Sequence, residues 1–319
     1  MKSRLFWILA IGLLLAVLLL GAVQLSSLLG RAVPTDEVVT APVKSEADTG
    51  ITPVIFRTVN EYGPTGEKML RLNGTSEPNA VLIVLNNNER LRQIRADDEG
   101  NWAIDIEVNS DEIMVIEFVM FVEGGLNVRG DETVLRIPVP SREVVLADDN
   151  TEYIAPSLRM SLIMVTAPGG PSRIVQTPFG GSPTDGPLTM GPIDYDDTGG
   201  VIFSGTTEEE GRVRIYAGPQ QIGETRVGAG GRWNFIAGNM LPLGENEIAA
   251  ELIKTDGIAA RVSVPFERLP PSQDNSSSAT LDVRYEPFRW QIRRPLLGGG
   301  AQYTAIFAPQ EAEALIVEE

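Results

Sequence analysis

The sequence predicts a mainly β protein in which one N-terminal transmembrane helix precedes two repeated β-sandwich modules and a small C-terminal module. Three observations lead to this prediction. An uncharged apolar run lies near the amino terminus, a self-similar stretch recurs at one fixed offset, and apolar and polar residues alternate with period two in both copies. The chain has 319 residues, 43% of them hydrophobic, which suits two or three small cores better than a single one.

The first predicted element is a transmembrane signal-anchor helix within residues 1–23. Lys2 and Arg4 precede an uncharged run over residues 5–23, which at helical rise can cross a hydrocarbon core of roughly 30 Å. Basic residues before the run and an acidic bulk after it place the amino terminus in the cytoplasm. The sequence therefore predicts a single-pass inner-membrane protein with its bulk in the periplasm.

A cleaved signal peptide is the alternative interpretation of this run. Its apolar region would be shorter and would end in a small-x-small cleavage pattern, which Leu20-Gly21-Ala22 does not supply. We therefore favour a retained anchor. Residues 24–50 follow it and are rich in Pro, Thr, Ala and acids without sustained periodicity, as expected for a flexible stalk.

An internal repeat predicts that one domain has been duplicated. Gly74-Thr75 recurs as Gly205-Thr206, and the same offset carries Gly100-Asn101-Trp102 onto Gly231-Arg232-Trp233. The same offset also aligns the apolar run at 83–85 with 214–216, and each copy closes on a similar segment, RIPVP at 136–140 and RVSVP at 261–265. We place repeat 1 at residues 51–140 and repeat 2 at residues 187–268.

The local pattern within both copies is that of β-strands. The segments at 102–106 and 212–215 alternate with period two, and turn-forming residues separate the apolar runs. Trp102 and Trp233 are expected to point inward as equivalent core residues. Two antiparallel sandwiches of the immunoglobulin type, without a disulfide, account for this spacing.

The remaining segments are interpreted as linkers and a tail. Residues 141–186 mix acids, Pro and Gly-Gly pairs, and we expect a long linker with room for one strand in the apolar run at 162–165. A Pro- and Ser-rich linker at 269–280 then separates repeat 2 from a tail at 281–319.

Composition excludes several classes of function. The formal net charge is −17, which repels a phosphate backbone, so no nucleic-acid partner is expected. The chain contains no Cys and no His, which removes thiol nucleophiles, His-based triads and ordinary zinc sites. Glycoside hydrolysis by two carboxylates stays open in principle, but no pair of acids is marked out by spacing. We therefore predict a protein that is not an enzyme and that has no cofactor and no metal site.

The repeats resemble a family of the bacterial envelope. The stretch GTSEPNAVLIVLNNNERLRQIRADDEGNW and the stretch DYDDTGGVIFSGTTEEEGRVRIY are similar to Ig-like repeats of envelope proteins that end in a LysM peptidoglycan-binding domain. The tail at 283–294 and 300–307 is similar to the first half of such a LysM, with Trp290, Ile292 and Tyr303 on the family's core positions. The resemblance implies a small α/β LysM-like remnant.

This tail departs from the LysM pattern in two places. Glu286-Pro287-Phe288-Arg289 replaces the turn before the family's first helix, and the second half of the domain is missing. The resemblance implies that both loops of the glycan groove are altered or lost.

The tail nevertheless supplies the candidate contacts for a glycan or a partner, which are Phe288, Arg289, Trp290, Arg293, Arg294 and Tyr303. The aromatic side chains suit stacking on sugar rings, but they are also the large side chains available for a tail core. The arginines suit an anionic peptidoglycan stem or an acidic protein surface, and surface arginines on a short helix are the alternative.

Two acidic loops have the composition of calcium ligands. Asp97-Asp98-Glu99 and Asp194-Tyr195-Asp196-Asp197 offer hard oxygen donors. Solvated β-turns have the same composition, because Asp is enriched there for its own hydrogen bonds, and this is the interpretation we favour.

Two hypotheses for function follow. In the first, the chain is a membrane-anchored periplasmic spacer that presents its tail to the cell wall and binds peptidoglycan. In the second, the Ig-like domains form a structural scaffold that docks a protein partner in an envelope complex, with no glycan binding.

Overall fold

The structure is a computed structural model, and it describes residues 52–63, 68–109, 111–121, 127–140, 160–167, 169–181, 186–238, 241–255, 257–271, 281–296, 300–309 and 313–314. Within these residues no helix is long and apolar enough to cross a membrane. The expected anchor and stalk, residues 1–50, form a unit separate from residues 51–319 and lie outside the described residues.

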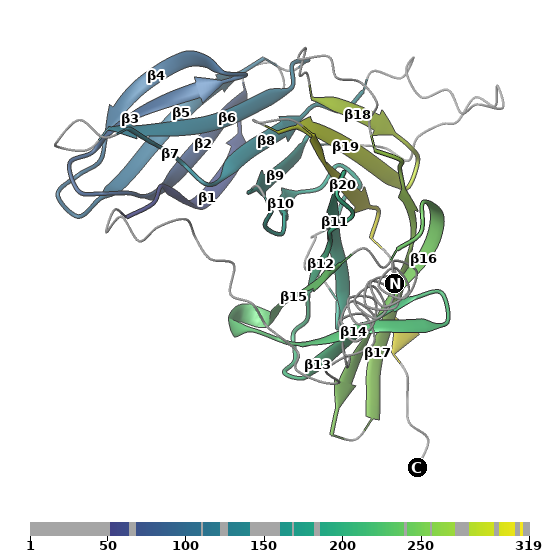
Figure 1. Cartoon of the computed structure of the whole chain (residues 1–319). Coiled ribbons are helices and arrows are strands. Elements are labelled where there is room, and N and C mark those ends of the chain that lie inside the picture. The colour runs from purple at the N-terminus through teal and green to yellow at the C-terminus, as the bar shows by residue number, and fades with distance from the viewer. Residues whose placement is uncertain are drawn as a thin grey trace, which may run out of the picture. The chain divides into compact units, whose positions relative to one another are not determined.

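The first copy of the repeat is a sandwich of two antiparallel sheets (Figure 1). One sheet has the order β1-β2-β5, and the other contains β8-β6-β3-β4, with β7 paired to β6. The strands are β1 (Ile55–Tyr62), β2 (Lys68–Thr75), β3 (Val81–Asn86), β4 (Glu89–Arg95), β5 (Asn101–Val108), β6 (Met114–Phe121), β7 (Asn127–Arg129) and β8 (Thr133–Ile137).

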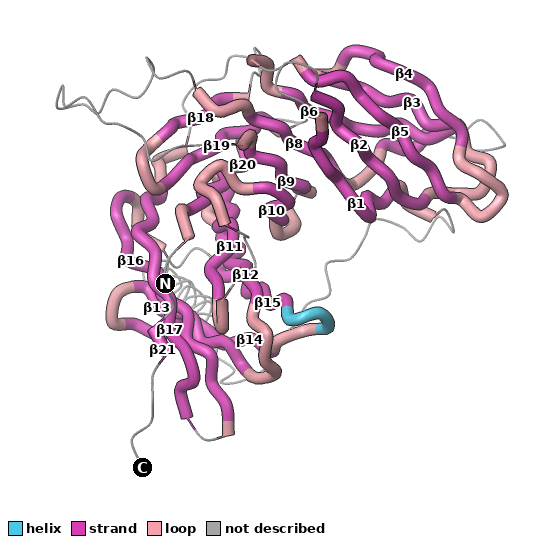
Figure 2. The backbone as a smooth tube through the Cα atoms, turned by 180° about the vertical axis from the view of Figure 1, so that it is seen from behind, coloured by secondary structure: helices cyan, strands magenta, loops and turns pink. Residues whose placement is uncertain are grey.

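The second copy repeats this strand order. One sheet contains β11-β12-β15 and the other β14-β13-β16-β17, with β21 (Glu313–Ala314) paired to β17. Its elements are β11 (Thr189–Asp196), β12 (Val201–Thr206), β13 (Arg212–Ala217), β14 (Gln220–Arg226), the short helix η1 (Ala229–Gly231), β15 (Arg232–Ala237), β16 (Gly244–Lys254) and β17 (Gly257–Arg268). The turn η1 is the helix drawn in Figure 2, and all other described elements are strands. The predicted pair of repeated β-sandwiches is thus confirmed.

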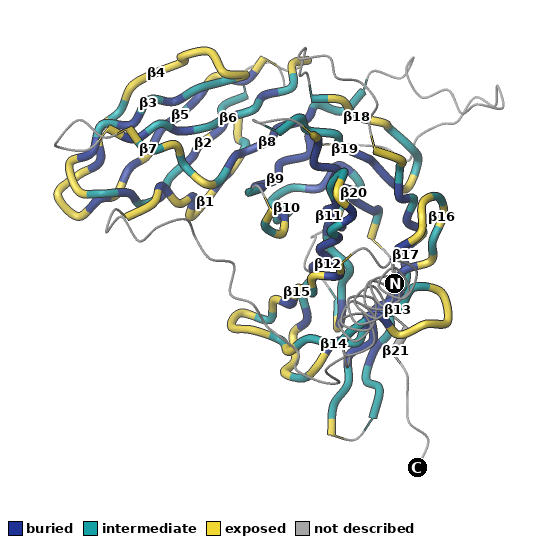
Figure 3. The backbone as a smooth tube through the Cα atoms, in the orientation of Figure 1, coloured by how far each residue is buried: buried dark blue, intermediate teal, exposed yellow. Residues whose placement is uncertain are grey.

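Period-two alternation places one face of each strand in a core. In β5, Trp102, Ile104 and Ile106 are buried, while the residues between them are exposed or half-buried. They join an apolar cluster between the two sheets of copy 1, and a second cluster, which includes Trp233, fills copy 2. Figure 3 shows the buried residues along the inner strands of each sandwich.

In each copy, the tryptophan ring packs over a glycine of the neighbouring strand. Gly74 of β2 lies directly opposite Trp102, and Gly205 of β12 lies opposite Trp233. A Cβ atom at either glycine would lie 2.5 Å from the indole Cζ2 of its partner, inside van der Waals contact. The same Cβ atom would lie even closer to a backbone carbonyl oxygen, that of Ile55 at Gly74 and that of Thr189 at Gly205. The glycine of each Gly-Thr pair is therefore required because the neighbouring strand and the indole ring together occupy the space of a side chain.

The glycine before each tryptophan-bearing strand has a second role. Gly100 and Gly231 have φ values of 82° and 72°, a left-handed conformation that favours glycine. Their carbonyl groups accept the backbone N–H of Ser76 and of Thr207, each at 2.8 Å. The Gly-x-Trp motif thus turns the chain, ties it to the preceding strand and delivers the indole to the core.

The segment at 141–186 was expected to be a linker with room for one strand at 162–165, and that strand is present, but the segment is more than a linker, which corrects the rest of the interpretation. It contains β9 (Leu162–Thr166) and β10 (Arg173–Gln176), which continue the second sheet of copy 1 in the order β10-β9-β8. All five residues of β9 are buried. A short run that is apolar on both faces is typical of a strand covered on both sides.

The tail is a part of copy 2, which corrects the expectation of a separate α/β LysM-like remnant. Its strands β18 (Asp282–Tyr285), β19 (Arg289–Pro295) and β20 (Ala301–Phe307) extend the first sheet of copy 2 in the order β11-β20-β19-β18. The described residues of the tail contain no helix, because the segment expected to be helical alternates apolar and polar residues as β19.

A third apolar cluster joins these two additions, and we call it the repeat joint. It packs β8 and β9 of the first body of strands against β19 and β20 of the second. Its buried members are Leu135, Ile137, Leu162, Met164, Trp290, Ile292 and Ile306. Neighbouring residues on the same strands, such as Val134 and Ile163, face the core of copy 1 instead. The strands at the joint are therefore covered on both faces.

We predict that Gly205→Ala destabilises the protein by about 1–3 kcal/mol, because the new methyl group must displace both the Thr189 carbonyl of β11 and the Trp233 ring. Gly238→Ala is the matched control, since no atom lies within 4 Å of its Cβ position. Chemical denaturation of the two variants measures the difference. Equal stabilities would show that the indole is not seated on Gly205.

Candidate functional site

The candidate aromatic residues of the tail do not share a surface. Trp290 is 1% exposed and lies in the repeat joint, in edge contact with Tyr285 at 4.8 Å and with Phe179 at 5.7 Å between ring centroids. Tyr303 is 4% exposed and stacks on Tyr195 at 4.9 Å in the core of copy 2. Phe288, at the turn before β19, is 56% exposed. Sugar stacking therefore has one exposed ring here rather than three.

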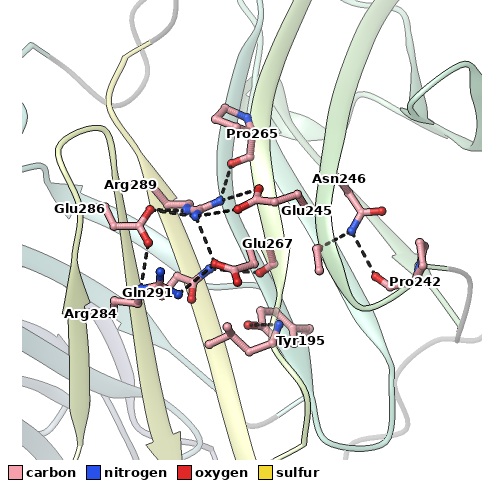
Figure 4. Close-up of polar contacts among 12 residues, drawn as sticks. Tyr195, Pro242, Glu245, Asn246, Pro265, Glu267, Arg284, Glu286, Arg289 and Gln291 are labelled. Carbon is pink, nitrogen blue, oxygen red and sulfur yellow. Dashed lines mark hydrogen bonds and ion pairs between the residues drawn. The ribbon is translucent and has the colours of Figure 1, made fainter. Parts of the chain in front are cut away.

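Arg289 is surrounded by carboxylates (Figure 4). Its Nη2 lies 2.8 Å from Glu286 and 3.3 Å from Glu267, and its Nη1 lies 3.3 Å from Glu245. Burial alone would lower the pKa of Arg289, but the carboxylates outweigh it and the pKa is raised. Arg284 adds a second cation, bonded to Glu267 and Glu286 at 3.0 Å each.

This Arg289 cluster connects the tail to the far sheet of copy 2. Glu245 belongs to β16 and Glu267 to β17, and the carbonyl of Pro265 also accepts Arg289 at 3.4 Å. With three carboxylates around two arginines, the cluster neutralises Arg289 and cannot attract an anionic glycan stem. Its role is to hold β19 across the open end of the second sandwich.

A shallow depression lies beside the cluster. It has a volume of about 460 Å³ and is lined by Glu245, Asn246, Glu247, Ser263, Val264 and Pro265 of β16 and β17. The lining carries carboxylates but no cation, so anions are disfavoured. No aromatic ring lines the depression, whereas aromatic and apolar side chains predominate in a preformed ligand pocket.

Arg294 belongs to the repeat joint. Its guanidinium donates to Gln302 at 2.7 Å and to the hydroxyl of Thr133, on β8, at 3.4 Å. Burial lowers the pKa of Arg294. Arg293 is half-exposed. Burial raises the pKa of Tyr303, and the hydrogen bond between Arg293 and Tyr303 partly offsets this rise. The three arginines thus have three different environments and do not form one positive patch.

Asp194 is the site residue whose role the sequence interpretation missed. It is 1% exposed, and its carboxylate accepts the N–H and the hydroxyl of Ser172, each at 2.7 Å, and the hydroxyl of Thr304 at 2.5 Å. Ser172 precedes β10, whereas Thr304 lies on β20. The carboxylate therefore links the segment between the repeats to the tail. Burial raises the pKa of Asp194, and these hydrogen bonds offset the rise only in part.

The other acidic residues of the two expected loops are engaged in turns. Asp97 accepts the N–H groups of Glu99 and Asn101 at 3.1 and 2.6 Å, and Asp196 accepts those of Thr198 and Gly199 at 2.9 Å each. Asp197 accepts the N–H of Ala301. Across the described ranges, no three acidic side chains come together as a metal site.

The fold defines the described part of the chain as a tandem of immunoglobulin-like β-sandwiches. No family model matches the chain, and no curated protein matches it. Two solved structures among those similar to it are the central fibronectin-III array of RIM-binding protein and the BSP domain of a biofilm-associated protein.

The likeness to both structures is distant. The fibronectin-III array is 8% identical, with 82% of this chain and 96% of that chain covered and a TM-score of 0.24. The BSP domain is 9% identical, with 84% of this chain and 63% of that chain covered and a TM-score of 0.20. Scores this low carry no argument about function, so the assignment depends on the strand order of the two copies.

We predict that Asp194→Asn changes the pH dependence of stability. A raised folded-state pKa means that wild type takes up a proton on folding between the unfolded and folded values, so this carboxyl favours folding more as the pH falls. An asparagine at this position does not titrate. Its amide NH2 can donate to the hydroxyls of Ser172 and Thr304, and its amide oxygen can accept the N–H of Ser172. Relative to Asp194→Asn, wild type should gain stability as the pH is lowered through the range in which folded Asp194 takes up its proton, above the ordinary titration range of an aspartate.

Denaturation of both proteins across this pH range gives the difference between their free energies of unfolding. The other titrating groups are the same in both proteins, so their contributions cancel in this difference. Glu61 is a useful internal contrast, because hydrogen bonds from Lys68, Ser161 and Arg136 outweigh its desolvation and lower its pKa. Its contribution is lost as the pH falls, and it is common to both proteins. Parallel stability curves would mean that Asp194 is charged and fully compensated.

Proposed function

We propose that this chain is a non-enzymatic scaffold of the cell envelope, whose two fused sandwiches present one fixed geometry to a partner protein. The repeat joint is the observation that carries the proposal. A tether needs only flexible linkers, whereas this chain buries seven apolar side chains to attach one repeat to the next. A buried contact of this kind suits a part that must keep its geometry.

Membrane anchoring by residues 1–23 is the part of this proposal that concerns localisation. It is supported by the uncharged run over 5–23, by the preceding Lys2 and Arg4, and by the acidic bulk. Orientation follows from the same residues, with the sandwiches on the periplasmic side of the inner membrane.

The absence of His and Cys from the whole sequence supports a function without catalysis. The described carboxylates singled out above are occupied as well. Asp194 and Glu61 are bonded to neighbouring side chains, and the carboxylates around Arg289 are paired with Arg289 or Arg284.

Peptidoglycan binding was the first hypothesis from sequence, and its candidate contacts are used elsewhere in the fold. Trp290 and Tyr303 fill apolar cores and Arg289 is paired with carboxylates, so a glycan would contact Phe288 and the half-exposed arginines. We therefore rank the scaffold above the glycan-binding spacer. Pull-down of the full chain on purified sacculi separates the two functions.

We predict that a cysteine introduced at exposed Gln221 reacts with a membrane-impermeant maleimide in intact spheroplasts, while a cysteine at Ser3 reacts only after lysis. The native chain has no Cys, so each variant carries one reactive group and the wild type is the blank. The reason is the charge asymmetry around residues 5–23. Labelling of both positions before lysis, or of neither, would contradict the proposed orientation, and recovery of the chain in the soluble fraction would contradict the anchor.

A further inference from the structure

Strand β4 is an unusually exposed edge of copy 1. Six of its seven residues are exposed, as Figure 3 shows along the strand. In the described part of the chain it pairs only with β3, so the backbone groups on its outer side have no strand beside them. An edge of this kind is a template on which an additional strand can pair.

The two copies differ at this edge although their backbones agree. Strand β14 is the equivalent of β4, and both carry a one-residue bulge at the same place, at Leu91 and at Ile222. Ile222 is 8% exposed, whereas Leu91 is 46% exposed. The next residue of β14 is Gly223, which is covered by the ring of Phe235. Both strands are edges of their sheets, but the residues of β14 are more covered by neighbouring side chains than those of β4.

The charges differ in the same way. In copy 2, Glu224 of β14 accepts Arg212 at 3.0 Å and Arg214 at 2.8 Å, so the edge is neutralised within the chain. Gln93 takes the position of Glu224 in copy 1.

Three arginines on β4 consequently have no carboxylate partner among the described residues. Arg90 donates to the side-chain oxygen of Gln93 at 2.8 Å, Arg92 to the carbonyl of Asp105 at 3.4 Å, and Arg95 to the carbonyl of Asn79 at 2.8 Å. All three acceptors are neutral. With Glu89 counted, β4 carries a net charge of +2, although the formal net charge of the chain is −17.

We propose that β4 is a docking edge for an acidic, extended polypeptide segment of a partner protein, which adds to the sheet as a strand. The outer backbone groups of β4 supply the pairing, the arginines select carboxylates, and Leu91 offers an apolar contact. This inference rests on the proposed scaffold function and names the chemistry of its partner.

Other occupants fit the edge less well. A second copy of β4 would bring a strand with three arginines and one carboxylate, Glu89, against another of the same net charge of +2, and this repulsion disfavours the pairing of two chains. A long polyanion would be attracted by the arginines of β4 but repelled by the rest of the chain, whose formal net charge is −17. A short acidic strand avoids both penalties.

The test uses the full chain in detergent micelles and a fluorescent synthetic peptide that alternates Glu and Val over the length of β4. Fluorescence anisotropy should show binding, and hydrogen exchange should slow within residues 89–95. The triple variant Arg90→Gln, Arg92→Gln, Arg95→Gln should weaken binding by about tenfold or more.

The matched control is the triple variant Arg57→Gln, Arg226→Gln, Arg232→Gln, which removes the same charge from exposed strand positions elsewhere and should leave the affinity within about twofold of wild type. Equal losses in both triple variants would show that net charge alone attracts the peptide and would overturn the proposal.

A second peptide, with alternate backbone nitrogens methylated, keeps the charges and removes the N–H donors. Its weaker binding would support strand addition, whereas equal binding would overturn it. Tighter binding of dextran sulfate than of the peptide would assign the edge to anionic polymers instead, and no binding of the peptide would remove the docking edge. None of these results bears on the maleimide labelling that tests the membrane anchor. A failure of the docking edge can therefore be distinguished from a failure of the proposed anchored scaffold.

Discussion

The burial of two pairs of strands on both faces is the constraint on which the described architecture depends. A strand at the edge of a sandwich has one covered face, and β8 and β11 would be the edges on this side if each copy ended where its repeat ends, because β20 and β19 belong to the tail. Instead, β9 continues one sheet and β19 continues the other, and their outer apolar faces meet in the repeat joint. Segments outside the duplicated sequence therefore connect the duplicated domains.

The joint combines apolar packing with buried polar groups. Its apolar side includes Trp290 and Met164, and its polar side includes the Asp194 carboxylate with two hydroxyl groups. The polar side requires complete pairing, because a buried carboxylate without donors would cost several kcal/mol of stability. Ser172 and Thr304 supply those donors from segments on either side of the joint. A geometry with matched donors is more specific than an apolar contact alone.

Duplication followed by divergence explains how two similar sandwiches take different roles. The glycine seats under Trp102 and Trp233 are the same in both copies because they are needed for folding. The edge strands β4 and β14 differ because folding does not require their side chains. In copy 2 the edge is neutralised by Glu224, while copy 1 keeps exposed arginines. The side chains that differ between the copies are therefore the better guide to function.

The repeat and its strands could be predicted from sequence because their signals are local. Gly-x-Trp spacing and period-two alternation need only neighbouring residues, and both led to the correct sandwiches. The segment at 141–186 was taken for a linker because the apolar run of β9 is short and lies between Pro- and Gly-rich stretches. A run that is apolar on both faces is typical of a strand covered on both sides, but nothing in the local sequence shows which strands cover it.

The tail and the Asp194 contacts could not be predicted for a related reason. The likeness to LysM led to an expected helix where β19 pairs with β20, since Trp290 and Ile292 suit an apolar face in either structure. Asp194 reaches Thr304 across 110 positions of the chain, and it had been placed in an acidic loop by its neighbours alone. Pairings this distant in sequence leave no periodic signal.

The most direct test of the central claim is calorimetric unfolding of a soluble chain that lacks residues 1–23. The account predicts a single transition with equal calorimetric and van't Hoff enthalpies, because the joint couples the two sandwiches. The double variant Leu135→Ala, Ile292→Ala, with one substitution on each side of the joint, should divide it into two transitions. Two independent transitions in the unsubstituted protein would contradict the account, since they would show that the joint does not couple the repeats.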